Sequence, residues 1–78
     1  MSMTNSLLQV VLPSGNRAVY EVQPQHLNEV IGLTLAERAR CYGTQLAHEL
    51  DGRWYKAGGW EEVTDPRLLK LLNNMKGV

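Results

Sequence analysis

The sequence contains few of the residues that bind metals or form cross-links. Its 78 residues include one cysteine, Cys41, and two histidines. A single cysteine cannot form an intrachain disulfide, and one thiol with two histidines lacks the paired spacing of a structural zinc site. We therefore expect folding to depend on side-chain packing alone, and we expect no metal ion or other cofactor.

An excess of charge of one sign is also absent. Lysine plus arginine number 8 and aspartate plus glutamate number 8, so the formal net charge is zero. A chain that binds nucleic acid mainly through phosphates usually carries a clear excess of basic residues. The balanced charge therefore argues against a nucleic-acid partner.

Long hydrophobic runs are missing as well. The longest apolar stretch, residues 7–12, is interrupted by Gln9 and followed by Pro13. It is too short for the core of a signal peptide or for a membrane span. We expect a cytoplasmic protein with no membrane partner, folded as a single domain over residues 1–78 with residues 1–5 flexible.

The first part of the chain has the pattern of a β-hairpin. Residues 7–12 and 17–22 are rich in β-branched and other apolar side chains, and residues 13–16 (Pro-Ser-Gly-Asn) favour a turn. The first of these strands is apolar on both faces, whereas the second alternates with charged residues. This difference predicts that the first strand is the more central one.

The middle of the chain predicts two helices. The first begins at Pro24, has Leu27, Val30 and Ile31 at helical spacing, and stops at Gly32. The second begins with a capping box of Thr34 and Glu37 and continues to Asp51-Gly52. Its apolar arc contains a glycine at the centre of a ridge of small residues, and the full arc is Leu35, Ala36, Ala39, Tyr42, Gly43, Leu46, Ala47 and Leu50.

The last third predicts a second hairpin and a final helix. Residues 53–57 and 60–63 flank Gly58-Gly59, which can form a two-residue hairpin turn. The register of that hairpin places Lys56 opposite Glu61 and Trp54 opposite Val63. The alternative is a single strand followed by a glycine loop.

After this segment, Thr64 or Asp65 caps a helix that has Pro66 in its first turn and ends near Met75. The element order β-β-α-α-β-β-α predicts an α+β domain. Its antiparallel sheet is built from two β-hairpins and covered on one face by helices.

No catalytic arrangement is indicated. Cys41 and His48 lie on the polar arc of the same predicted helix, but seven residues separate them by roughly 10 Å. His26 belongs to the preceding predicted helix. The neighbouring Glu61 and Glu62 point to opposite faces of a strand and cannot converge on a substrate. We therefore expect a protein that is not an enzyme.

Two features favour binding of another protein. Alternation along the second hairpin sends Trp54 to one face and Tyr55 with Trp60 to the other, so one face is left outside the core. Tryptophan and tyrosine are enriched in binding hot spots. On the last helix the apolar residues span about 160°, more than one sheet contact covers, so Leu68 and Leu71 are expected to be exposed.

The hypothesis from sequence is a small accessory or regulatory protein. It binds a protein partner through Tyr55, Trp60, Leu68 and Leu71 and forms a homodimer through the surplus leucines. Its small size suggests a phage or prophage protein. The alternative is a dimeric nucleic-acid-binding regulator. It would use a basic stripe on the last helix made by Arg67, Lys70 and Asn74, with Lys76 nearby.

Overall fold

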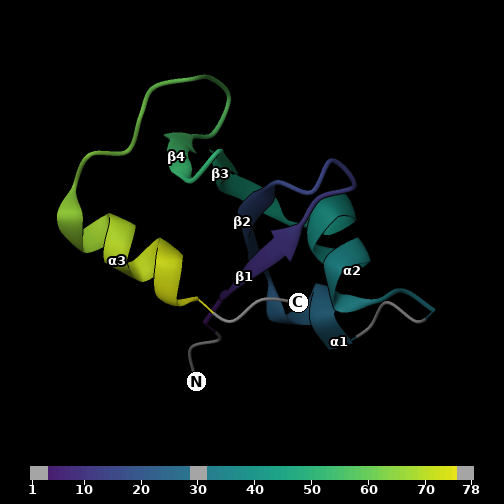
Figure 1. Ribbon diagram of the computed structural model, residues 1–78. Helices are drawn as coiled ribbons and strands as arrows, with labels where there is room; N and C mark the ends of the chain where they lie inside the picture. Colours follow the sequence, from purple (N-terminus) through teal and green to yellow (C-terminus); the bar gives the residue numbers. More distant parts are fainter. Residues whose placement is uncertain (1–3, 29–31, 76–78) are drawn as a thin grey trace.

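The computed structural model describes residues 4–28 and 32–75. Its elements are β1 (Ser6–Val11), β2 (Arg17–Val22), α1 (Pro24–Asn28), α2 (Leu35–Tyr42), β3 (Thr44–Leu50), β4 (Arg53–Lys56) and α3 (Pro66–Asn74). The strands form one antiparallel sheet in the order β1-β2-β3-β4 (Figure 1). The predicted α+β class and element order are confirmed. In the described ranges, no helix has the length and apolar character needed to cross a membrane.

The first hairpin forms as predicted, but its position in the sheet differs. β1 and β2 pair from Ser6 with Val22 to Val11 with Arg17, and the turn is closed by the Leu12 N–H, which donates to the Asn16 carbonyl at 2.7 Å. The expectation that β1 is central is wrong, because β1 lies at the edge and β2 pairs with β3 on its other side. Leu8 and Val10 of β1 pack toward α1 and α2, whereas Leu7 and Val11 on the other face are exposed.

The predicted helix over residues 34–50 is half helix and half strand. The capping box of Thr34 and Glu37 is present, but the helix ends at Tyr42 and Gly43 continues in extended backbone. Residues 44–50 form β3, which pairs with β2 through a bulge. Helical spacing of apolar residues beyond Gly43 was therefore misleading, because pairing between two strands determined the conformation.

The dipeptide expected to end this helix is a hairpin turn. Asp51 and Gly52 both have positive φ, +52° and +83°, as the two central residues of a type I′ turn require. This turn joins β3 to β4. The third and fourth strands are thus residues 44–50 and 53–56 rather than 53–57 and 60–63.

The register predicted for residues 60–63 is nevertheless correct. The Val63 N–H donates to the Trp54 carbonyl at 2.9 Å, and the Lys56 N–H donates to the Glu61 carbonyl at 2.8 Å. Tyr55 and Glu62 form a single β-bridge. The segment follows the outer edge of β4 without becoming a full strand, an arrangement close to the glycine-loop alternative.

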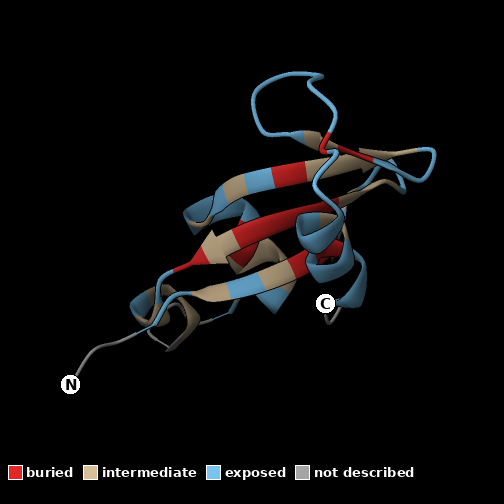
Figure 2. Ribbon diagram, turned by 90° about the vertical axis from the view of Figure 1, so that its left-hand side faces the viewer, coloured by how far each residue is buried: buried red, intermediate tan, exposed pale blue. Residues whose placement is uncertain are grey.

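Helices cover both faces of the sheet rather than the single face expected. In Figure 1 the sheet is seen nearly edge-on, with α3 on one side and α1 with α2 on the other. Figure 2 shows the buried residues concentrated on β2, between these layers. Against α1 and α2 the buried residues are Val10, Ala18, Tyr20, Val22 and Ala39. Against α3 they are Val19, Ala47, Trp54, Val63 and Leu72.

The starts of α1 and α3 agree with the expected signals. Asp65 caps α3 by accepting a hydrogen bond from the Arg67 N–H at 2.9 Å, and Pro66 is the first residue of that helix. α1 begins at Pro24 and is described as far as Asn28. Gly32, the predicted stop, has a positive φ. Val30 and Ile31, on which the rest of that prediction depended, lie outside the described residues, as do residues 1–3 of the expected flexible segment.

Candidate functional site

Three aromatic rings gather at the end of the sheet formed by β3, β4 and the segment that follows. His48 of β3 lies directly opposite Tyr55 of β4, and Trp60 follows the glycine pair after β4. The Trp60 ring meets the Tyr55 ring edge to face at 5.3 Å between centroids and the His48 ring in the same manner at 4.8 Å. These residues, His48, Tyr55 and Trp60, are called the aromatic surface below.

The loop that carries Trp60 is fixed at several points. The His48 Nε2–H donates to the Gly59 carbonyl at 2.8 Å, since a carbonyl oxygen can only accept. The Ala57 N–H donates to the Leu46 carbonyl at 3.2 Å, and the Lys56 ammonium lies 3.3 Å from a Glu61 carboxylate oxygen. These bonds fix the loop that carries Trp60, while 67% of the Trp60 surface remains exposed.

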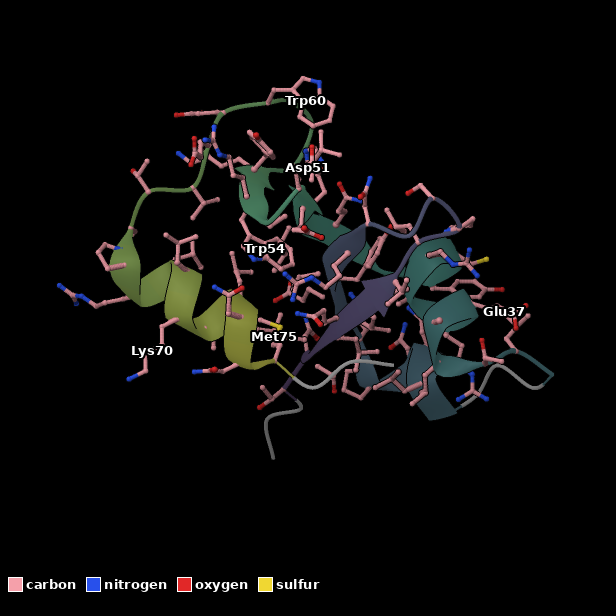
Figure 3. The ribbon with its side chains drawn as sticks, in the orientation of Figure 1. Glu37, Asp51, Trp54, Trp60, Lys70 and Met75 are labelled. Carbon is pink, nitrogen blue, oxygen red and sulfur yellow. The ribbon has the colours of Figure 1, made fainter. Side chains whose placement is uncertain are left out.

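The two tryptophans occupy opposite environments, as alternation along the strand predicts. Trp54 is 1% exposed and lies against α3, where its indole N–H donates to the Asn73 side-chain oxygen at 3.0 Å. Tyr55 and Trp60 lie together on the other face. Figure 3 shows Trp60 above the sheet and Trp54 between the sheet and α3.

His48 is a member of the aromatic surface that the sequence reasoning missed. Helical spacing puts His48 on the polar arc of the predicted helix, and this prediction conceals its position opposite Tyr55. The signal that could have revealed it is Asp51-Gly52, because this dipeptide is typical of a two-residue hairpin turn. A hairpin about that turn pairs His48 with Tyr55 directly.

Leu68 and Leu71 do not join the aromatic surface. They are 39% and 50% exposed on α3, whereas Leu69 and Leu72 of the same helix face the sheet. Because α3 packs on the face that carries Trp54, these leucines lie on the opposite side of the sheet from Tyr55. The sequence hypothesis of a single surface combining the four residues therefore has to be divided into two surfaces.

The basic stripe is also on α3 and separate from the aromatic surface. Arg67, Lys70 and Asn74 are exposed, and in the described part of the chain neither Arg67 nor Lys70 has an ion-pair partner. Figure 3 shows Lys70 pointing away from the molecule on α3, remote from Trp60. Lys76 lies outside the described residues.

The residues considered for catalysis have separate structural settings. Cys41 is exposed on α2, and His48 belongs to β3, so the argument from spacing along one helix no longer applies. The His48 Nε2 is engaged by the Gly59 carbonyl. His26 stacks on Tyr42 with ring centroids 4.9 Å apart.

The carboxylates divide in the same way. Glu61 pairs with Lys56, and Asp65 caps α3. Their neighbour Glu62 forms the single β-bridge to Tyr55. No common site collects the three residues.

Glu49, which lies opposite Trp54 in the β3–β4 ladder, accepts several hydrogen bonds. It accepts hydrogen bonds from the Gly52 N–H at 2.7 Å, the Arg17 N–H at 3.1 Å and the Arg17 Nε at 3.3 Å. The Gly52 bond contributes most to a lowered pKa of Glu49, and the bonds to Arg17 lower it further against the opposing effect of burial. Arg17 also stacks over the Trp54 ring at 5.2 Å. This group ties β2 to the β3–β4 turn, which is a structural role.

Comparison of the chain with protein-family models, with curated proteins and with solved structures gave no match. The functional proposal consequently depends on the geometry of the aromatic surface.

Proposed function

We propose that this chain is a small non-enzymatic accessory or regulatory protein that binds a protein partner through the aromatic surface. The observation that carries the proposal is Trp60, a residue that is 67% exposed and yet held in place by two other rings. A large apolar side chain left outside the core gains by being covered by a partner.

The way in which Trp60 is held supports a binding role. Ordering a side chain on association costs about 0.5–1.5 kcal/mol. Contacts of Trp60 with Tyr55 and His48, together with the Gly59–His48 hydrogen bond, restrict the ring before any partner arrives. Because less free energy is then spent on ordering the ring, more of the free energy gained by burying it contributes to affinity. Tryptophan and tyrosine are also the side chains most often found as hot spots.

The alternative function, nucleic-acid binding, is favoured by one observation. Arg67 and Lys70 project from adjacent turns of α3, and neither is engaged in an ion pair with the described residues. Free basic side chains of this kind can contact the phosphates of a nucleic acid, and such binding weakens steeply as the salt concentration increases. The balanced charge of the whole chain argues for the protein partner as the first choice.

Affinity capture from the native host, with and without nuclease, separates these functions. Three baits are compared: the parent chain, Trp60→Ala, and Lys70→Ala as an equally exposed control on α3. The proposal expects a protein that is retained after nuclease treatment, retained by the Lys70 variant and lost by the Trp60 variant. Loss of the captured material after nuclease, or on substitution of Lys70 but not Trp60, would support nucleic-acid binding instead.

A further inference from the structure

The two edges of the sheet differ in how they are protected. At the β4 edge the outward backbone groups of Trp54 and Lys56 are bonded by the 60–63 segment. At the other edge β1 has the sequence Ser-Leu-Leu-Gln-Val-Val, with no charged residue and no proline, and its ladder with β2 is regular. Exposed edge strands are usually protected by charge, proline or a bulge. β1 has none of these devices.

The outward backbone groups of β1 can be identified from the ladder. The Leu12 N–H bonds to the Asn16 carbonyl, and in an antiparallel pair hydrogen-bonded positions alternate with positions that face away. The N–H and C=O groups of Leu7, Gln9 and Val11 therefore point outward. No backbone hydrogen bond to them occurs within residues 4–28 and 32–75. The side chains of Leu7 and Val11 are 38% and 58% exposed.

We infer that β1 is a self-association edge that pairs antiparallel with β1 of a second copy of this chain. Placing the two-fold axis at Gln9 sets Gln9 opposite the second copy's Gln9 and Leu7 opposite its Val11. All of these residues have outward backbone groups, so each pair exchanges both of its N–H···O=C bonds. The two four-stranded sheets become one continuous sheet.

Side chains and charges agree with this register. Leu7 and Val11 cover each other across the two-fold axis, which removes both from water. On β2, Glu21 lies beside Leu7 and Arg17 beside Val11, so each row across the dimer has an acidic residue at one end and a basic residue at the other. Like charges do not face each other. The same patch serves both copies, as a two-fold interface requires.

The inference is tested by sedimentation over a range of concentrations combined with amide hydrogen exchange. The parent chain is expected to dimerise, with the Leu7, Gln9 and Val11 amides becoming protected as concentration rises. Val11→Lys is expected to raise the dimer dissociation constant roughly tenfold or more, since lysine on an edge opposes strand pairing. Leu46→Lys is the matched control, because Leu46 is 42% exposed on a strand that is paired on both sides. It should leave the dimer unchanged.

A third variant distinguishes this edge from the exposed leucines of α3. Leu68→Glu should leave the dimer intact if β1 forms the interface. A chain that stays monomeric throughout, or a dimer that is lost with Leu68→Glu and retained with Val11→Lys, would overturn the inference. A dimer in which the three β1 amides still exchange at the rate of the dilute monomer would do the same. Thermal melts of all variants establish that each is folded.

Discussion

Trp54 and Trp60 show how six residues of separation decide two different roles. Trp54 is enclosed by Val63 and Leu72 on the α3 face, and Trp60 is the most exposed large apolar side chain of the described residues. Strand alternation and the register of Lys56 with Glu61 sufficed to predict this division. The contribution of His48 could not be predicted in the same way, because it depends on a pairing between strands that the sequence pattern concealed.

The two tryptophans should respond differently to the same substitution. Trp54→Ala is expected to lower the free energy of unfolding by about 3–5 kcal/mol, because it leaves a large cavity. Trp60→Ala should change it by no more than about 0.5 kcal/mol but weaken partner binding by about 2 kcal/mol or more. Urea denaturation and a binding titration give the two quantities. Equal destabilisation by both variants would mean that Trp60 is part of the core.

Glu49 should make stability depend on pH in the acid range. Its pKa in the folded protein lies below the ordinary value of 4.5, so the unfolded chain takes up a proton at a higher pH than the folded chain. The stabilisation from ionised Glu49 is complete above pH 4.5. It is lost as the pH falls from 4.5 through the lowered pKa of Glu49 in the folded protein. Urea midpoints from neutral pH downward should therefore fall less steeply for Glu49→Gln than for the parent. Parallel curves would contradict the assigned hydrogen bonds.

At the level of elements, the segment from Thr34 to Leu50 is the main failure of prediction. Its first half was correctly predicted because a capping box is a local signal, satisfied within one turn. Its second half has both helical and strand-compatible spacing, and the outcome depended on β2 and β4 being available on either side. The Asp51-Gly52 turn was the local feature that favoured the strand.

Gly43 is the position at which helix changes to strand, and we expect it to tolerate no side chain. Its backbone is ordinary for any residue, φ −84° and ψ 167°, but an added Cβ would lie 2.6 Å from the Ala39 carbonyl oxygen and 3.0 Å from a methyl carbon of Val22. Gly43→Ala, and more strongly Gly43→Leu, should lower the free energy of unfolding by about 1–3 kcal/mol through overpacking.

The matched control for Gly43 is Gly59. Gly59 has no positive φ, and an added Cβ there has no atom within 4 Å. Chemical denaturation of Gly59→Ala should give a midpoint close to that of the parent. A Gly43→Ala midpoint at or above the parent value would show that the α2–β3 junction can relax to admit a methyl group.

For the whole molecule, the arrangement of layers was harder to predict than the elements. β1 is apolar on both faces, which is typical of a central strand, but it is an edge strand whose Leu7 and Val11 remain exposed. Val10 of β1 packs toward α2. Gln9, its neighbour, reaches α3, where its side-chain amide donates to the Leu72 carbonyl at 3.0 Å. The pairing of β2 with β3 puts β1 at the edge, and no local signal within β1 encodes that pairing or the path of α3 across the second face.

The two-faced arrangement predicts that α3 is a separable unit of stability. Its attachment depends on Leu72 with Leu69 and Met75, and on the hydrogen bonds to Gln9 and Trp54, whereas β2 has buried side chains on both faces. Elements with fewer buried contacts open at lower free energy than the global transition. Native-state hydrogen exchange should therefore show α3 amides exchanging through a partial opening while β2 amides require global unfolding.

Leu72 and its neighbour Leu71 provide the matched pair that tests this opening. Leu72 is 2% exposed and Leu71 is 50% exposed, so Leu72→Ala should cost about 2–4 kcal/mol and Leu71→Ala no more than about 0.5 kcal/mol. The loss caused by Leu72→Ala should appear mainly in the exchange of α3 and only weakly in that of α2, because the α2 cluster lies on the other side of the sheet. If α3 amides in the parent exchange only with those of β2, the molecule unfolds as one cooperative unit and α3 is not separable.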